Sequence, residues 1–106
     1  MKPHTKALKM SLNQKCNSYI HFAVKANKVL WGLDFIKKSK FLPYVIIYDK
    51  TLGANSKKQL DYFAEQNEVE LIEVEENYLN NLLKRNNVKM IGIIDESLSE
   101  AIIKNK

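Results

Sequence analysis

Residues 44–60 read YVIIYDKTLGANSKKQL. The first five of these residues are apolar throughout, and a turn-forming LGAN segment follows shortly after them. A short apolar run without alternation is typical of a strand that is covered on both faces. Ser56 and Gln59 have the spacing of a capping box at the start of a helix, which would bury Leu60 and Phe63. The stretch therefore predicts a buried strand, a turn and an amphipathic helix.

Strand-like and helix-like segments alternate along the rest of the chain. Residues 69–75 (VELIEVE) mostly alternate, as in a half-exposed strand, and residues 89–95 (KMIGIID) have the pattern of another buried strand. The other predicted elements are a short strand at 29–31 and helices at 18–26, 33–40, 79–83 and from Ser97, which forms a second capping box with Glu100. This alternation predicts an α/β fold with right-handed crossovers and helices on both faces of the sheet.

The length and composition fit one domain. The chain has 106 residues, of which 45% are hydrophobic, so it can form a single packed core. Residues 1–15 (MKPHTKALKMSLNQK) carry four lysines and no acid, and we interpret them as a basic N-terminal tail with a helical tendency near residues 7–12. Residues 16–106 then form the folded domain, which we expect to be a monomer.

Several classes of protein are disfavoured by simple counts. The single cysteine, Cys16, excludes an intramolecular disulfide framework and a zinc site built from several thiolates. No signal peptide is recognisable, and no apolar run approaches the roughly 20 residues that cross a bilayer. We therefore expect a cytoplasmic protein without a membrane partner.

The positive charge is concentrated in the first part of the chain. Residues 1–40 hold nine lysines and one acid, a net charge of +8, whereas residues 41–106 have a net charge of −3. A basic segment of this kind attracts phosphate backbones and releases their counterions. The alternative is a lysine-rich, solvated surface, and charge alone does not separate the two.

Two aspartates at strand ends are the candidates for catalysis. VIIYDKTLG (45–53) is similar to the DKTGT motif of cation-pumping ATPases and related phosphatases, in which the aspartate is a nucleophile assisted by magnesium. Asp95 ends another strand and would supply a second carboxylate, but Leu52 stands where the motif needs glycine. We favour the alternative that Asp49 and Asp95 begin turns or helix caps.

No other constellation suggests an enzyme. His4 and His21 have no companions at metal-ligand or catalytic-triad spacing, and the three glycines are isolated, so no phosphate-binding loop is present. We predict no catalytic residues, no metal site and no cofactor. A small aspartate-dependent phosphotransfer enzyme is only a remote third hypothesis.

The segment KANKVLWGLDFIKK (25–38) contains the only tryptophan and one of three glycines. A glycine at a helix start lets the backbone approach a phosphate closely, and Lys28, Lys37 and Lys38 would add positive charge. Trp31 would either stack on an unpaired base or fill the core, and for this residue alone we favour the core.

The longer stretch FAVKANKVLWGLDFIKK (22–38) resembles the AxxAGKLxxGxxxxxK segment of small bacterial members of the kink-turn RNA-binding ribosomal protein family, which includes large-subunit proteins of the L-seven-Ae and L-thirty-e type. The resemblance continues through VIIYDKTLGANSKKQL and ends with VKMIGIIDESLSEAI, so it covers about residues 18–104. No single motif is specific, but their order and spacing agree. The resemblance implies a three-layer α-β-α sandwich around a mixed four-stranded sheet.

The resemblance also implies how RNA would be bound. RNA-binding members open the second helix with Gly-x-Asn-Glu/Gln-x-x-Lys, in which the glycine and lysine approach the RNA backbone and the two middle residues recognise sheared G·A pairs. Gly32 and Lys38 match this pattern, whereas Asp34 stands at the Asn position and Phe35 at the Glu/Gln position. The family's LGxAxG loop appears here as LNNLLK (79–84), in which Asn80 and Lys84 replace both glycines.

These observations lead to two main hypotheses. The first is a non-catalytic RNA-binding or ribosome-associated protein whose kink-turn base recognition is weakened, with Lys38 as the strongest single candidate for an RNA contact. The second is a protein-interaction module that has kept the fold and lost RNA binding. The predicted RNA-binding residues are Lys28, Trp31, Gly32, Asp34, Lys37 and Lys38.

Overall fold

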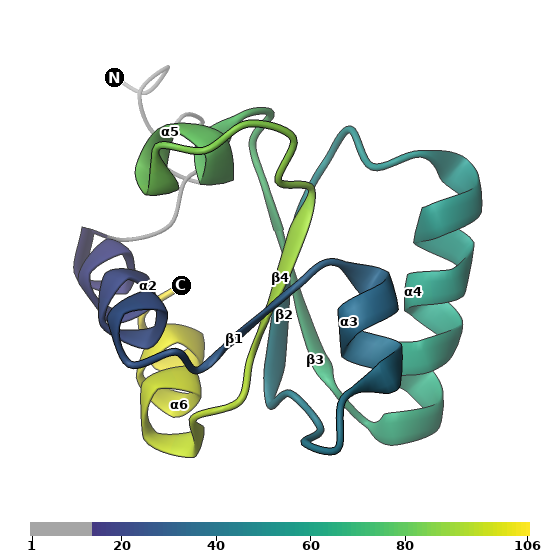
Figure 1. Ribbon diagram of the computed structural model, residues 1–106, viewed down its shortest axis with the longest axis horizontal. Helices are drawn as coiled ribbons and strands as arrows, with labels where there is room; N and C mark the ends of the chain where they lie inside the picture. The colour runs from purple at the N-terminus through teal and green to yellow at the C-terminus, as the bar shows by residue number, and fades with distance from the viewer. Residues whose placement is uncertain (1–13) are drawn as a thin grey trace.

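The computed structural model describes residues 14–106 (Figure 1). Its strands are β1 (Val29–Trp31), β2 (Val45–Asp49), β3 (Glu70–Val74) and β4 (Met90–Ile93). Its helices are α2 (Gln14–Lys25), α3 (Leu33–Lys38), α4 (Ala54–Asn67), α5 (Tyr78–Leu83) and α6 (Glu96–Asn105). Residues 1–13 of the predicted basic tail, including its helical stretch, lie outside the described residues.

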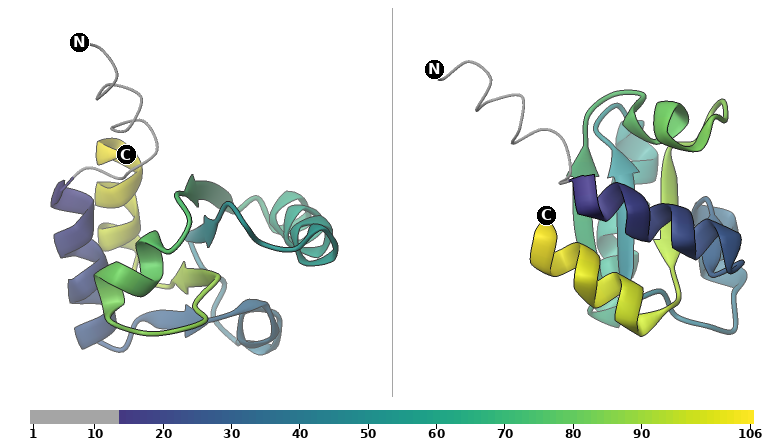
Figure 2. Two further views of the ribbon diagram at one scale, coloured as in Figure 1. Left: turned by 90° about the horizontal axis from the view of Figure 1, so that it is seen from above. Right: turned by 90° about the vertical axis from the view of Figure 1, so that its left-hand side faces the viewer.

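The four strands form one mixed sheet in the order β1-β4-β2-β3. β2 and β3 are parallel, and β4 runs antiparallel to both of its neighbours, β1 and β2. Helices α2 and α6 lie side by side on one face of the sheet, and α3 and α4 cover the other (Figures 1 and 2). The predicted three-layer α-β-α sandwich around a mixed four-stranded sheet is confirmed.

Alternation along the strands divides the core into two clusters. In β2, Val45 and Ile47 pack toward α2, α5 and α6, whereas Ile46 and Tyr48 pack toward α3 and α4. Every residue of β2 and β4 is buried, as the apolar runs predict. β3 is half-exposed, as the alternating VELIEVE segment predicts. It pairs with β2 in parallel and does not form a hairpin with it. None of the helices within residues 14–106 has the length and apolar character of a membrane span.

The two predicted capping boxes are wrong. Helix α4 begins at Ala54, and Gly53 stands at its N-cap without a side-chain hydrogen bond, so Ser56 already lies inside the helix. Helix α6 begins at Glu96, and the Asp95 side chain accepts a hydrogen bond of 2.8 Å from the Leu98 N–H. The chain becomes helical directly after each strand-to-helix turn, so each N-cap lies upstream of the serine.

Gly92 marks the closest approach between β4 and the layer of α3. A Cβ atom at Gly92 would lie 3.1 Å from the Cβ of Pro43 and 3.3 Å from the Cδ1 of Ile36. Ile36 is 2% exposed and Gly92 is buried, so neither side has free space to move into. Glycine at this position therefore allows α3 and the segment before β2 to pack on the sheet.

Substitution of Gly92 tests this packing. Gly92→Ala should lower the free energy of unfolding by about 1–3 kcal/mol, because the added methyl group overfills a closed contact. Gly53→Ala is the matched control: its Cβ would meet no atom within 4 Å and its φ is −59°, so the change should stay within about 0.5 kcal/mol. Urea unfolding of the three proteins measures the difference. Equal effects of the two substitutions would contradict the packing account.

Candidate nucleic-acid interface

The carboxyl ends of three strands meet at one edge of the sheet. β2 and β3 are parallel, and both β1 and β2 are antiparallel to β4, so β1, β2 and β3 point the same way. We call this the carboxyl edge; it comprises Trp31 and Gly32, residues 50–53, residues 75–77 and the loop 84–89 that leads into β4. In open α/β sheets, ligands bind outside the carboxyl ends of the strands.

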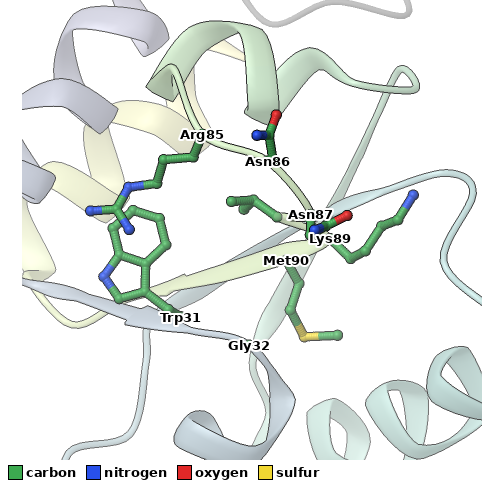
Figure 3. A pocket seen from close by; sticks show the side chains of 8 residues that line it. Trp31, Gly32, Arg85, Asn86, Asn87, Lys89 and Met90 are labelled. Carbon is green, nitrogen blue, oxygen red and sulfur yellow. The ribbon is translucent and has the colours of Figure 1, made fainter.

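Trp31 is half-buried at the end of β1. Its side chain packs against the core cluster that includes α5, so the expectation of a core role holds for part of the ring. The guanidinium carbon of Arg85 lies 4.1 Å from the ring centroid, and the two side chains lie against one another in Figure 3. A cation over an indole face at this distance is a favourable contact. The face of Trp31 that a base would need is therefore occupied by Arg85.

Gly32 follows directly and has a backbone conformation that favours glycine. Its φ is 101°, and it stands at the N-cap of α3 without a side-chain hydrogen bond. Its carbonyl accepts a hydrogen bond of 3.0 Å from the Ile36 N–H, which begins the helix. A Cβ atom here would meet nothing within 4 Å, so glycine is required by the backbone angle and not by crowding. The surface above Gly32 is consequently open to a ligand.

Trp31 and Gly32 share a pocket with a segment that is distant in the sequence (Figure 3). The pocket has a volume of about 370 Å³, and its other walls are residues 85–90. A second pocket of about 610 Å³ adjoins it, because Arg85 and Asn86 line both. The remaining lining residues of the second pocket are Asn77, Asn80, Asn81 and Lys84. Amides and cations thus dominate the lining of these two pockets.

Three cations lie on the loop 84–89. Lys84, Arg85 and Lys89 are all exposed, and the ion pairs formed within residues 14–106 involve none of them. Lys89 Nζ donates a hydrogen bond of 2.8 Å to Thr51 Oγ1, which holds this lysine over the neighbouring turn. The loop therefore presents three cations that form no ion pair within residues 14–106, although the buried carboxylate of Asp49 partly offsets the charge of Lys89. Positive charge of this kind is the electrostatic requirement for binding phosphate groups.

Lys84 and Asn80 give the loop 84–89 a defined conformation. Lys84 has a φ of 55° and closes α5 in the left-handed conformation that glycine usually takes. The Asn80 side chain accepts a hydrogen bond of 2.8 Å from the Val88 N–H, and its carbonyl accepts one of 3.1 Å from the Arg85 N–H. Asn80 thereby fixes the loop at two points. Lys84 therefore forms the turn without glycine and adds a cation to it.

The other predicted site residues are spread along α3 and β1. Asp34 is exposed in the first turn of α3, next to the pocket, whereas Lys38 is exposed at the opposite end of that helix. Lys37 donates a hydrogen bond of 2.7 Å to Gln59 and so faces α4. Lys28 precedes β1, where its carbonyl bonds the Ile94 N–H, at the other edge of the sheet. The structure thus brings together Trp31, Gly32 and Asp34, and separates the three lysines from them.

Sequence reasoning missed the residues of the loop 84–89. The stretch KRNNVK holds three cations and two amides without an acid, and it lies directly before a predicted strand. That composition is a usable signal for an anion-binding loop. Its position beside Trp31 could not be predicted from the sequence, because the pairing of β1 with β4 joins segments about sixty residues apart.

Asp49 is buried at the end of β2 and connects two turns of the carboxyl edge. Its side chain is fully buried, and Oδ1 accepts hydrogen bonds from the Thr51 N–H (2.8 Å) and the Thr51 hydroxyl, while Oδ2 accepts one of 2.8 Å from the Asn77 N–H. Burial alone would raise the pKa of this carboxyl, but these hydrogen bonds outweigh it and hold the pKa below its ordinary value. Asp49 thus joins the end of β2 to the turn before α5.

Asp95 is not a partner of Asp49. Val45 pairs with Ile93 at one end of the β2–β4 ladder and Tyr48 with Met90 at the other, so Asp95 follows β4 at the edge opposite Asp49. The two aspartates act as a turn anchor and a helix cap, as we favoured from the sequence. Within residues 14–106, no three side chains from histidine, cysteine, aspartate and glutamate form a group suited to a metal ion.

The comparisons with known proteins define the fold and go no further. No protein-family model matches the sequence, and no curated protein matches it. A solved structure described as a protein with unknown function from Bacillus halodurans is similar, with a TM-score of 0.73 and 18% identity over 87% of this chain and 96% of the other. Likeness at this level of identity shows a shared fold.

The role of Asp49 is testable through the pH dependence of stability. Its folded-state pKa lies below the unfolded value of about 3.9, so its contribution is present above that pH and is lost as the pH falls through the folded-state pKa. Asp49→Asn should therefore cost about 1–3 kcal/mol of unfolding free energy at neutral pH, and less in strong acid. Asp34→Asn, which changes an exposed carboxylate, is the control. Urea unfolding across a pH series measures both, and a pH-independent cost for Asp49→Asn would contradict the account.

Proposed function

We propose that this protein is a non-catalytic RNA-binding protein that contacts structured RNA through its carboxyl edge. The observation that carries the proposal is the pocket in which Trp31 and Gly32 meet the cationic loop 84–89. Three exposed cations that form no ion pair within residues 14–106 surround an open glycine backbone and a row of amides. Phosphate groups and the polar edges of unpaired bases are the ligands that such a surface recognises.

Contacts to the RNA backbone should dominate over contacts to bases. Phe35 stands where the similar family carries a base-reading glutamate or glutamine, and it is 65% exposed, so it offers a ring and no hydrogen-bond acceptor. Asp34 beside it is exposed and would repel phosphates that approach the start of α3. The weakened kink-turn recognition that we expected from the sequence is therefore part of the proposal.

The family resemblance supports a cytoplasmic, monomeric protein whose RNA is ribosomal or belongs to another ribonucleoprotein. The structure adds one independent reason to prefer binding over phosphotransfer: both oxygens of Asp49 already accept hydrogen bonds from the protein. A nucleophilic carboxylate would have to break those bonds to reach a phosphate.

A second candidate function is a protein-interaction module on the same fold. Phe35 is 65% exposed on α3, so its ring is available as an apolar anchor for a protein partner. If the carboxyl edge binds no RNA at low salt, this second function takes precedence.

Arg85 provides the sharpest test of RNA binding. Arg85→Ala should weaken binding of kink-turn RNA and of a plain duplex by a similar factor, on the order of 1 kcal/mol, and should reduce the slope of log affinity against log salt by about one. Lys104→Ala is the matched control, because Lys104 is exposed on α6 and lies away from the carboxyl edge. Fluorescence titrations over a salt series give both quantities.

Two results would contradict the proposal. Wild-type protein that binds neither RNA at low salt has no RNA-binding edge. Equal losses from Arg85→Ala and Lys104→Ala would mean that only the net charge matters.

Phe35 tests the weakened base recognition. Phe35→Glu restores an acceptor at the base-reading position, so it should improve binding of kink-turn RNA relative to duplex, although it adds a negative charge that penalises both. Phe35→Ala is the control for loss of the ring. The ratio of the two affinities is the measurement, and a strong kink-turn preference in the wild-type protein would show that Phe35 does not impair recognition.

A further inference from the structure

The segment before β2 exposes three large apolar side chains within four residues. Phe41 is 65% exposed, Leu42 47% and Tyr44 48%, although Pro43 between them is buried. We call residues 39–44 the apolar loop. Single exposed apolar residues are ordinary on protein surfaces, but three within four residues, beside a pocket, favour a surface that a partner covers.

The apolar loop is held in one conformation. Ser39 Oγ donates a hydrogen bond of 2.9 Å to the Phe41 carbonyl and accepts one of 3.0 Å from the Phe41 N–H. The Tyr44 N–H donates to the Ile93 carbonyl at 2.9 Å, which attaches the loop to β4. Pro43 packs beside Gly92, as described above. The apolar side chains are therefore presented on a fixed backbone, so a partner pays little entropy to order them.

A pocket of about 370 Å³ lies against this loop. Its walls are residues 40–44 together with Asn67, Glu68 and Ile94. Tyr44 precedes β2 and Ile94 follows β4, so the pocket lies at the edge of the sheet opposite the carboxyl edge. We call this the amino edge. It shares no lining residue with the candidate RNA-binding pockets.

The chain segment that contains the apolar loop is positively charged, whereas Asp95 and Glu96 follow Ile94 at the same edge. Residues 37–44 read KKSKFLPY, with three lysines and no acid. The ion pairs within residues 14–106 do not include Lys38 or Lys40, and Lys28 lies at the same edge through its backbone bond to Ile94. Glu68 is the acid that lines the pocket. A partner that places carboxylates beside these lysines would gain attraction as well as apolar contact.

We propose that the amino edge docks an acidic amphipathic segment of a partner protein, whose apolar side chains contact Phe41, Leu42 and Tyr44. This proposal does not depend on RNA binding at the carboxyl edge. Leu42, Pro43 and Ile94 give the pocket an aliphatic lining, which suits the apolar side chains of a peptide better than the faces of bases. Phe41 and Tyr44 could also stack on bases, so nucleic-acid binding at this surface is an outcome that the test below distinguishes.

The test uses the full chain and an array of short synthetic peptides. One set combines leucine and phenylalanine with aspartate and glutamate, and a matched set carries asparagine and glutamine in place of the acids. Binding is measured by fluorescence titration, and the surface is mapped by amide chemical-shift changes. We expect the acidic set to bind more tightly, with affinity that falls as salt rises and with shifts at residues 38–44, 67–68 and 94.

Substitutions separate the two edges. Phe41→Ser and Lys40→Glu should each weaken the acidic peptides by about tenfold, because the first removes an apolar anchor and the second inverts a charge at the rim. Phe22→Ser, which removes a 56% exposed side chain from α2, should leave binding unchanged. Arg85→Ala should also leave it unchanged, and Phe41→Ser should not affect RNA binding.

Three outcomes would overturn the proposal. The first is an acidic set that binds no better than the amide set, or not at all. The second is binding whose shifts fall outside the amino edge. The third is a loss of RNA affinity in Phe41→Ser without peptide binding, which would assign the apolar loop to nucleic acid.

Discussion

The two central strands bury every side chain, and this constraint determines the rest of the structure. β2 and β4 together have nine residues, and all nine are buried, so both faces of the sheet must be covered. Helices therefore form a layer on each side, and α3 approaches so closely that β4 needs a glycine beneath it. Because both faces are covered, the accessible positions for functional groups are the loops at the two edges of the sheet.

The antiparallel insertion of β4 gives the two edges different compositions. Because β4 enters the sheet from the carboxyl edge, the loop 84–89 that precedes it lies beside Trp31 and the turn after β2. The same strand leaves at the amino edge, where Ile94 lines the pocket of the apolar loop. A parallel β4 would have placed these two ends the other way round. The amide-rich cationic surface and the apolar surface are thus separated by the length of one strand.

Much of the fold was predictable because its signals are local. Apolar runs at 44–48 and 89–95 predicted the buried strands, and the alternating run at 69–75 predicted the half-exposed one. The helix starts were mispredicted because serine spacing does not reveal where the chain leaves a strand. The candidate site was only half predictable: Trp31 and Gly32 stood out, whereas Arg85 reaches them through a strand pairing that no local pattern encodes.

The contact between Trp31 and Arg85 bears on what kind of recognition the carboxyl edge can perform. A base can stack on the exposed side of Trp31 only after Arg85 has moved, so the two uses of the ring exclude each other. While Arg85 lies on the ring, its position is restricted, and fewer rotamers are lost when the guanidinium binds a phosphate. The indole then serves as a support for a cation and not as a platform for a base. An arginine that packs on an indole ring between two exposed lysines would recognise the charge and shape of a nucleic acid but not its sequence. Phe35 is exposed and offers no hydrogen-bond acceptor, so under the proposed function both residues favour contacts to an RNA backbone over contacts to bases.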